Sequence, residues 1–257
     1  MHIDPDITRD AQTVRDDYHG LIRHQVLELV PQGANNVLDI GGGIGASAAY
    51  LKTVGKASHA TVVDLVGTSC LPGIDRAFGG NLEDEALLGE VAQECGPFDV
   101  ILCLDVLEHL TDPWAVVDRL SEMLRPGGCI VASIPNVRNY RLLGPLLFQG
   151  RFDLVDRGIL DRTQLRWFVG STAKTLMARG GLRVDHFEPF FEGPRKRLFD
   201  RLTFGMFRDF LTIQFYIRSV KAGDRCDPIR GLDPVGQSWQ RRRADAAHAA
   251  GVAAYLA

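Results

Sequence analysis

The segment VLDIGGGIG, at residues 37–45, places a carboxylate and alternating glycines directly after a short apolar run. Gly41, Gly43 and Gly45 stand where an open α/β sheet turns from a strand into a helix and binds nucleotides. Glycine suits such a turn because it adopts unusual dihedral angles and because it lets a ligand approach the backbone. The segment therefore predicts a nucleotide-like ligand at the end of a strand.

The spacing of these glycines narrows the kind of ligand. A dinucleotide fingerprint reads G-x-G-x-x-G, and its pyrophosphate lies on the following helix N-terminus. Here the pattern is G-x-G-x-G, and Asp39 precedes it by two residues. A carboxylate so near would repel a pyrophosphate and attract the ammonium of an amino acid, which favours a ligand with a methionine moiety.

A second carboxylate, Asp64, ends the apolar run at residues 60–65. At the end of the second strand it would be placed to accept hydrogen bonds from both hydroxyls of a ribose. The alternative is a solvated strand end, and the glycine motif upstream favours the ribose contact.

The elements that must position these groups alternate along the chain. Apolar runs at residues 37–40, 60–65, 98–104 and 129–134 predict buried strands. Helical patterns come before and between them, at residues 17–29, at residues 46–51 and after the Asp112-Pro113 helix start, which Pro126-Gly127-Gly128 breaks. Further on we expect a helix capped by Ser171, a strand at 182–187 and a last strand at 211–220. This alternation predicts an α/β fold whose parallel sheet is covered by helices on both faces.

The composition sets limits on partners. The 257 residues carry a formal net charge of -3, which gives no electrostatic reason to expect nucleic acid or an anionic membrane. The five cysteines form no Cys-x-x-Cys pair, so neither a disulfide framework nor a zinc site is indicated. Without a signal-peptide pattern or a membrane-length apolar run, we expect a cytoplasmic protein.

The motifs VLDIGGGIG, VVDL, FDVILCLDVLEHL and LRPGG, in this order, resemble those of class I S-adenosylmethionine-dependent methyltransferases. Within that superfamily the chain is similar to the small-molecule group that includes ubiquinone-biosynthesis-type O-methyltransferases and methyltransferases of glycan and sugar pathways. The resemblance covers residues 18–187. It implies a Rossmann-like, doubly wound, mostly parallel sheet with an antiparallel last strand, an N-terminal helix and a cap inserted at about residues 137–170.

The resemblance also implies a set of cofactor-binding residues. Asp39 and the glycine backbone would hold the methionine part of S-adenosylmethionine, and Asp64 the ribose. Asn81 and Leu82 stand where such enzymes commonly hold the adenine with an aspartate and an apolar residue, and an asparagine carbonyl can still accept from the exocyclic amine. Leu104 would contribute backbone.

The segment DVLEHL borders the substrate cavity in the family, which makes His109 the candidate general base and Asp105 its companion. The spacing puts Asp105 beside Glu108 and His109 on one helical face. A histidine accepts a hydroxyl proton near neutral pH when its neutral form is favoured. The alternative is that His109 is a partly buried helix residue that orients a loop.

The cap region would supply the acceptor site. Its segment GILDRTQLRWF, at residues 158–168, resembles a feature of the glycan-associated members, in which this region covers the active site. Arg162, Arg166 and Trp167, together with Asn136, suit a polyhydroxylated or phosphorylated acceptor. The alternative is a surface insert whose Arg-Asp pairs only solvate it.

We therefore predict one methyltransferase domain at residues 1–221, followed by a tail at 222–257. The expected reaction is methyl transfer from S-adenosylmethionine, without a metal, to a hydroxyl of a small metabolite such as a sugar. Nitrogen or carbon acceptors, a non-catalytic cofactor-binding scaffold and a dinucleotide dehydrogenase are the alternatives. Arginine clusters at 195–197 and 241–243 leave a homodimer open, although solvated helix faces explain them as well.

Overall fold

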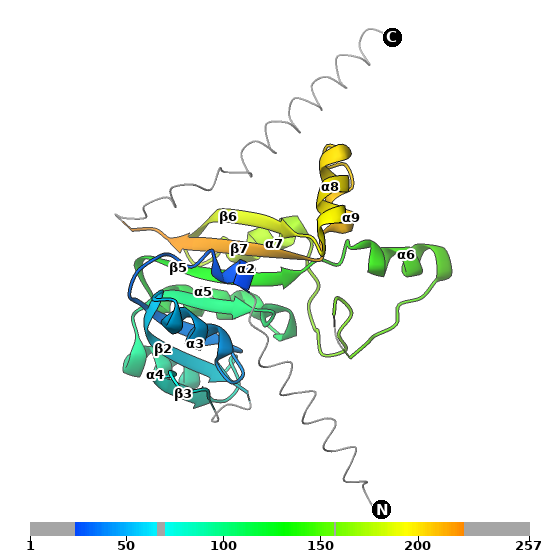
Figure 1. The fold of residues 1–257 in the computed structure, drawn as a ribbon. Helices are drawn as coiled ribbons and strands as arrows, with labels where there is room; N and C mark the ends of the chain where they lie inside the picture. Colours follow the sequence, from blue (N-terminus) through cyan, green and yellow to red (C-terminus); the bar gives the residue numbers. More distant parts are fainter. Residues whose placement is uncertain (1–23, 66–69, 157, 224–257) are drawn as a thin grey trace, which may run out of the picture.

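The computed structural model describes residues 24–65, 70–156 and 158–223. Within these ranges the chain forms one twisted sheet with helices on its two faces (Figure 1). The predicted C-terminal tail from residue 224 onward and the part of the N-terminal helix at residues 17–23 lie outside the described residues.

The sheet has seven strands in the order β3-β2-β1-β4-β5-β7-β6. All neighbours pair in parallel except β7, which runs antiparallel to both β5 and β6. This confirms the predicted fold class, a mostly parallel sheet with an antiparallel last strand. The strands are β1 (Asn35–Ile40), β2 (Ala57–Asp64), β3 (Arg76–Gly79), β4 (Phe98–Leu104), β5 (Leu124–Pro135), β6 (Leu182–Phe190) and β7 (Gln214–Lys221).

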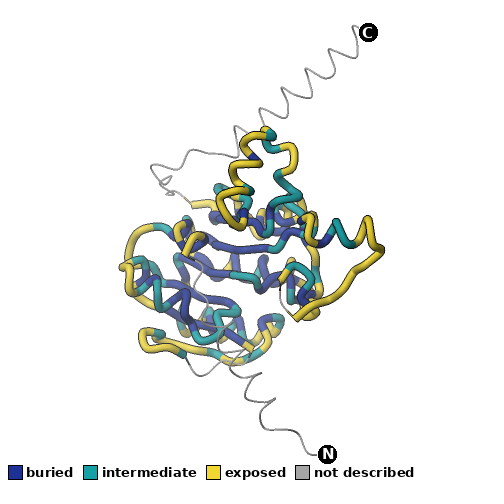
Figure 2. Tube along the Cα trace, turned by 45° about the vertical axis from the view of Figure 1, so that its right-hand side comes forward, coloured by how far each residue is buried: buried dark blue, intermediate teal, exposed yellow. Residues whose placement is uncertain are grey.

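Helices cover both faces of this sheet, because successive residues of the central strands are buried on opposite sides. In β4, Ile101 and Cys103 belong to one apolar cluster and Val100 and Leu102 to the other. The buried strands lie at the centre of the molecule (Figure 2). The helices are α2 (His24–Leu27), α3 (Ala46–Thr53), α4 (Glu85–Cys95), the 3-10 turn η1 (Leu107–His109), α5 (Pro113–Met123), α6 (Tyr140–Gln149), α7 (Gly170–Met177), α8 (Pro194–Leu202) and α9 (Arg208–Leu211).

Several predicted boundaries are wrong for identifiable reasons. The break at residues 126–128 lies inside β5, because α5 already ends at Met123 and the strand continues through a register shift beside Phe98. Ser171 is not a cap, since α7 begins one residue earlier with Val169 at its N-cap. The last strand starts at Gln214, because residues 208–211 form α9.

One predicted helix start is confirmed, and several elements were not predicted from the sequence. Asp112 caps α5 through the Ala115 N–H, as predicted from the Asp-Pro pair. β3, α4 and α8 had not been predicted. The N-terminal helix reaches only Leu27 and is followed by a turn rather than extending to residue 29.

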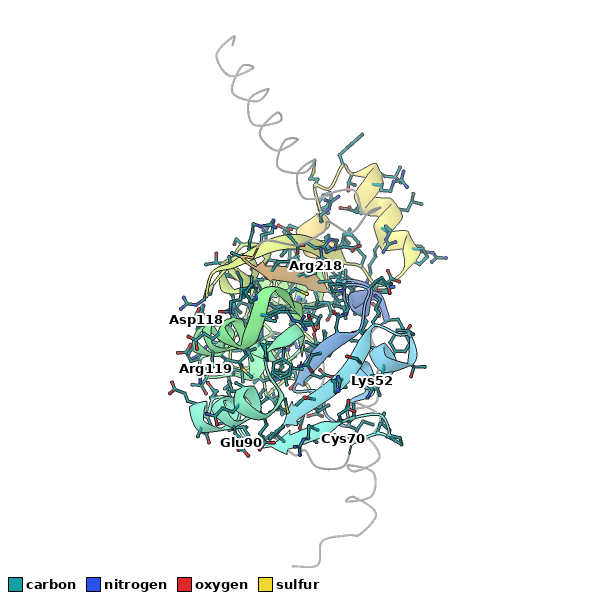
Figure 3. All side chains as sticks on the ribbon, turned by 90° about the vertical axis from the view of Figure 1, so that its left-hand side faces the viewer. Lys52, Cys70, Glu90, Asp118, Arg119 and Arg218 are labelled. Carbon is teal, nitrogen blue, oxygen red and sulfur yellow. The ribbon has the colours of Figure 1, made fainter. Side chains whose placement is uncertain are left out.

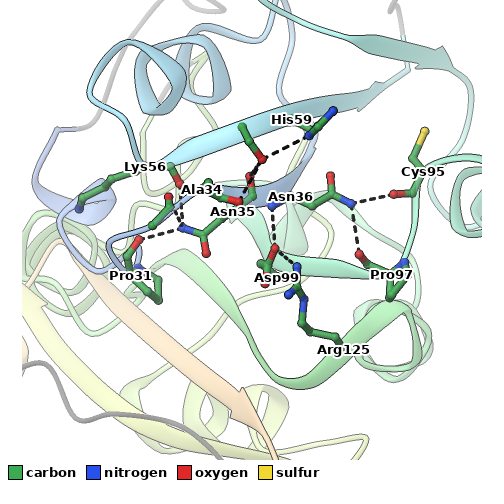
Figure 4. A network of polar contacts seen from close by, with 12 residues as sticks. Pro31, Ala34, Asn35, Asn36, Lys56, His59, Cys95, Pro97, Asp99 and Arg125 are labelled. Carbon is green, nitrogen blue, oxygen red and sulfur yellow. Dashed lines mark hydrogen bonds and ion pairs between the residues drawn. The ribbon is translucent and has the colours of Figure 1, made fainter.

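Polar contacts fix the starts of the central strands, at the end of the sheet opposite the glycine turn. The backbone N–H of Asn36 donates to Asp99 Oδ2 over 2.7 Å, and Arg125 pairs with the same carboxylate (Figure 4). On β7, Arg218 (labelled in Figure 3) donates from Nε to Asp185 Oδ1 over 3.0 Å and from Nη1 to the Leu29 carbonyl over 3.2 Å. These contacts connect segments that are far apart in the sequence.

The chain turns in opposite directions on the two sides of β1, toward β2 and β3 on one side and toward β4 and β5 on the other. A crevice forms at such a switch point, beyond the carboxyl ends of the strands, and ligands bind there in open α/β sheets. The glycine turn follows β1 at this point. The fold thus places the predicted site where the topology opens the sheet.

Asn136 joins the end of β5 to the segment that leads into β7. Its side chain is fully buried, and its Nδ2 donates to the carbonyls of Asp209 and Thr212 over 2.7 and 2.9 Å. Its Oδ1 accepts the Arg138 backbone N–H over 3.1 Å. This amide holds α9 and the start of α6 next to the end of the sheet.

We predict that Asn136→Ala lowers the free energy of unfolding by about 1 to 3 kcal/mol, because the Asp209 carbonyl loses its donor and the Arg138 N–H its acceptor. The Thr212 carbonyl keeps a hydrogen bond from Asn139 Nδ2. Urea denaturation measures the change. The matched control is Gln93→Ala, which removes an exposed amide on α4 and should change stability by no more than about 0.5 kcal/mol. Equal effects of the two variants would contradict the structural role of Asn136.

Candidate functional site

The turn after β1 depends on glycine at consecutive positions. Gly41, Gly43 and Gly45 have φ angles of +66°, +56° and +80°, which side chains of L residues rarely adopt. A Cβ on Gly41 would lie 2.7 Å from the Val106 side chain, and one on Gly42 would lie 2.6 Å from Cγ of Asp39. Gly42 occupies a variable position of the motif, so its steric constraint was not predicted.

Asp39 lies beneath this turn and is only 1% exposed. Among the described residues its Oδ2 has no hydrogen-bond partner. Burial, supplemented by the charge of Asp64, raises the pKa of this carboxyl to about 7, although the Ala48 backbone N–H opposes the shift. A buried carboxylate oxygen without a donor suits a ligand that brings its own, and an ammonium is such a donor.

Asp64, at the end of β2, is also buried and braces the turn. Its Oδ2 accepts the Gly43 N–H over 2.9 Å, and the neighbouring Val63 carbonyl accepts the Gly41 N–H over 2.8 Å. A solvated strand end is therefore the wrong description of this residue. Asp64 faces the same crevice as Asp39, as a ribose contact requires.

These residues border a cavity of about 340 Å³ at the ends of β1, β2 and β4. Six of the eight predicted cofactor residues line it: Asp39, Gly41, Asp64, Asn81, Leu82 and Leu104. Gly43 and Gly45 do not line it but form part of the turn. Sequence reasoning missed Ser47 and Glu83, which also line the cavity and carry no motif signal of their own.

The part of this cavity that is predicted to hold the adenine combines a buried and an exposed residue. Leu82 is buried, whereas Asn81 is exposed and its Oδ1 accepts the Glu83 N–H over 3.0 Å. That hydrogen bond shapes the turn and leaves the carbonyl oxygen a second lone pair. The predicted adenine contact of Asn81 stays a prediction.

A second cavity of about 430 Å³ adjoins the first and shares Asp105, His109 and Asp161 with it. The cap lines much of it, through α6 and the loop that follows. Polar groups that line it include Glu108, Arg141, Arg151, Asp153, Gln164 and Gln214. Two adjoining cavities with shared walls can hold a donor and an acceptor side by side.

Asp105 lies at the junction with an unusual backbone. Its φ of +53° is uncommon for a residue with a side chain, and such conformations concentrate at functional sites. Ser133 Oγ donates to Asp105 Oδ1 over 2.6 Å, and the Asp105 N–H donates to the Ser133 carbonyl. The predicted common helical face with Glu108 and His109 is wrong, because only the short 3-10 turn η1 follows.

His109, at the end of η1, lines both cavities. Its Nδ1 lies 3.0 Å from Oγ1 of Thr163 in the cap. The two interpretations of the sequence are thus compatible, since the histidine contacts a loop and also faces the space where an acceptor would lie. The chain offered no signal for Thr163, which is 54 residues away.

The four predicted acceptor-binding residues line neither of these two cavities, so their acceptor role stays a prediction. Asn136 is buried and uses its amide to hold the chain together. Arg162 is exposed and pairs with Asp156, as the surface-insert alternative expected. Arg166 bonds to the Thr111 carbonyl, and Trp167 packs edge-on against Phe152.

Within the described part of the chain, no group of three or more His, Cys, Asp or Glu side chains is arranged to hold a metal ion. Over the same residues, no helix combines the length and apolarity needed to cross a bilayer.

A switch-point crevice with a glycine turn and two acidic strand ends defines a nucleoside-binding protein of the Rossmann-like class. A family model described as a methyltransferase domain matches residues 14–187. The chain belongs to this methyltransferase family, and thereby to the class I S-adenosylmethionine-dependent methyltransferases.

Two curated relatives carry the name ubiquinone biosynthesis O-methyltransferase. The protein from Xylella fastidiosa (strain 9a5c) is 33% identical over 111 residues, which cover 42% of this chain and 44% of the relative. The protein from Psychrobacter arcticus is 31% identical over 146 residues, covering 54% and 56%. The chain thus matches about half the length of these relatives.

Solved structures agree on the fold. A methyltransferase from Mesorhizobium loti gives a TM-score of 0.53 at 16% identity, covering 77% of this chain and 96% of that one. One from Archaeoglobus fulgidus gives 0.53 at 15% identity, covering 85% and 100%. Both are described as S-adenosylmethionine-dependent, and at these identities they support the fold alone.

We predict that Asp39→Asn becomes more stable relative to the wild type as the pH rises. The folded chain keeps the Asp39 proton up to a pKa of about 7, whereas the unfolded chain loses it near the ordinary value of 3.8. The wild type therefore loses stability between these values, and the variant escapes that loss. From pH 5 to pH 8 its advantage should grow by roughly 2 to 3 kcal/mol.

Urea denaturation at the two pH values measures this difference, with Asp156→Asn, at an exposed carboxylate, as the matched control. A stability difference between Asp39→Asn and the wild type that is the same at pH 5 and pH 8 would contradict the burial account.

Proposed function

We propose that this protein transfers a methyl group from S-adenosylmethionine to a hydroxyl of a small molecule. The observation that carries the proposal is the junction of the two cavities at Asp105 and His109. One cavity has the chemistry for the cofactor, and the other has room and polar groups for an acceptor.

The residues of the first cavity fit the cofactor. Asp39 offers a buried carboxylate oxygen to an amino-acid ammonium, and Asp64 offers a carboxylate to ribose hydroxyls. The glycine turn leaves space where any Cβ would intrude. When bound, S-adenosylmethionine supplies a methyl group activated by its positively charged sulfur.

On the acceptor side, His109 would take the proton that a hydroxyl gives up as its oxygen becomes the nucleophile. Asp105, held by Ser133, would accept a hydrogen bond from the acceptor and orient it. Orientation is the larger contribution in such a displacement, since aligned reactants gain roughly 7 to 11 kcal/mol over free ones.

The second cavity favours an acceptor with several polar groups. Gln164 and Gln214 offer amides, and Arg141 and Arg151 offer guanidinium groups, beside apolar Leu142 and Ile159. Unlike the four acceptor contacts expected from the sequence, these residues line the second cavity. They suit a sugar or a similarly substituted biosynthetic intermediate.

The names of the curated relatives support oxygen as the methylated atom. Those matches cover about half of each relative, so the acceptors of the relatives are not assigned to this chain. A nitrogen or carbon acceptor is the alternative within the class. The cytoplasmic location and a homodimer also stay predictions.

Two measurements separate the remaining classes. Calorimetry with S-adenosylhomocysteine and with NAD distinguishes a methyltransferase site from a dehydrogenase site. Methyl transfer to a panel of sugars, phenols and amines then distinguishes an enzyme from a cofactor-binding scaffold and identifies the methylated atom.

We predict that His109→Gln lowers kcat by about a hundredfold to ten-thousandfold, because the acceptor hydroxyl loses its base. S-adenosylhomocysteine release from the acceptor panel measures the rate, and calorimetry should give an unchanged affinity for that product. The control is His59→Gln, which changes an exposed histidine near the start of β2, at the opposite end of the sheet. Full turnover by His109→Gln would exclude the histidine as the base.

A further inference from the structure

We infer that Asp161 and Thr163 of the cap fix the tautomer of His109, and that this leaves Nε2 able to act as the base. The inference rests on the proposed function for the role of the histidine, but its geometry stands by itself. Asp161 and Thr163 are positioning residues, since both act through His109.

The contacts form a short chain of hydrogen bonds. Thr163 Oγ1 donates to Asp161 Oδ1 over 2.6 Å, and the Thr163 backbone N–H donates to the same oxygen over 2.8 Å. On its other side, Thr163 Oγ1 lies 3.0 Å from His109 Nδ1. Asp161 is 9% exposed, so its carboxylate depends on these protein donors.

The single hydrogen of the Thr163 hydroxyl decides the direction of the last contact. Because that hydrogen is donated to Asp161, the hydroxyl oxygen can only accept from His109. Nδ1 of the ring must then carry a proton. In the neutral ring this leaves Nε2 as the nitrogen with a free lone pair, which is the form that a general base requires.

The opposite tautomer would break this arrangement. With the proton on Nε2, the lone pair of Nδ1 would face a hydroxyl oxygen whose hydrogen points to Asp161. The hydroxyl would have to turn away from the buried carboxylate to donate to the ring. When Nε2 takes up a proton, in contrast, the hydrogen bond from Nδ1–H to Thr163 is kept. The contacts therefore suit the ring both before and after it accepts a proton.

The cap also fixes the backbone that carries His109. The N–H groups of Leu165 and Arg166 donate to the Glu108 carbonyl over 2.8 and 2.9 Å, and the Arg166 guanidinium bonds to the Thr111 carbonyl. Residues 161–166 thus bind the chain on both sides of the histidine. Arg166, which was predicted to bind the acceptor, contributes to these contacts through both its backbone N–H and its guanidinium.

Nitrogen NMR of the full-length protein labelled at its histidines tests the inference without any acceptor. Spectra are recorded at pH 8 with S-adenosylhomocysteine, and the His109 signals are assigned from their absence in His109→Gln. We expect a neutral ring protonated at Nδ1 in the wild type and in Thr163→Ser. Thr163→Val should lose this preference. A wild-type ring protonated at Nε2, or a Thr163→Val ring identical to the wild type, would overturn the inference.

Kinetics provides a second readout that a purely structural role would not reproduce. Thr163→Val should lower kcat about ten- to hundredfold with an unchanged KM for S-adenosylmethionine, and Thr163→Ser should restore kcat to within about threefold. A Thr163→Ser variant as slow as Thr163→Val would contradict the positioning role.

The two proposals fail in different ways. If NMR gives the Nδ1–H tautomer while His109→Gln turns over normally, the function of the histidine is wrong and the tautomer assignment stands. If His109→Gln is inactive but the tautomer is Nε2–H, His109 stands as the base and the inferred role of Asp161 and Thr163 is wrong.

Discussion

The buried carboxylate of Asp39 beneath the turn after β1 is the constraint on which the rest of the site depends. Asp39 is only 1% exposed, and its Oδ2 has no hydrogen-bond donor among the residues that the structure describes. The turn above it leaves room for a ligand that supplies a donor, because glycines form that turn. Asp64 holds that turn through Gly43 N–H. Burial raises the pKa of Asp39 to about 7, so an ionised Asp39 lowers the stability of the folded protein. The ammonium of a bound ligand would offset this loss.

The proposed acceptor site is built differently from the cofactor site. The cofactor side uses strand ends and a single local turn, whereas the acceptor side joins η1 to cap residues more than 50 positions further along the chain. His109 connects the two cavities, and the cap determines its environment. A family of this kind can therefore change its acceptor through the cap while the sheet and the glycine turn stay the same.

Local patterns explain which features were predictable from the sequence. The glycine spacing, Asp39 and the ends of the buried strands identify the crevice, because each depends on neighbours in sequence. Asp161 and Thr163 were not predictable as partners of His109, since no periodicity links an irregular loop to a distant 3-10 turn. Trp167 and Arg162 were predicted from side-chain chemistry alone, and their contacts with Phe152 and Asp156 depend on how the cap folds. β3 was missed because it is a short, largely exposed edge strand.

A crystal structure of the full chain with S-adenosylhomocysteine tests the central claim most directly. The account predicts the amino group of the ligand at Asp39, the ribose hydroxyls at Asp64, and the sulfur facing the junction lined by Asp105 and His109. A ligand bound elsewhere, or one whose sulfur faces away from the second cavity, would contradict it.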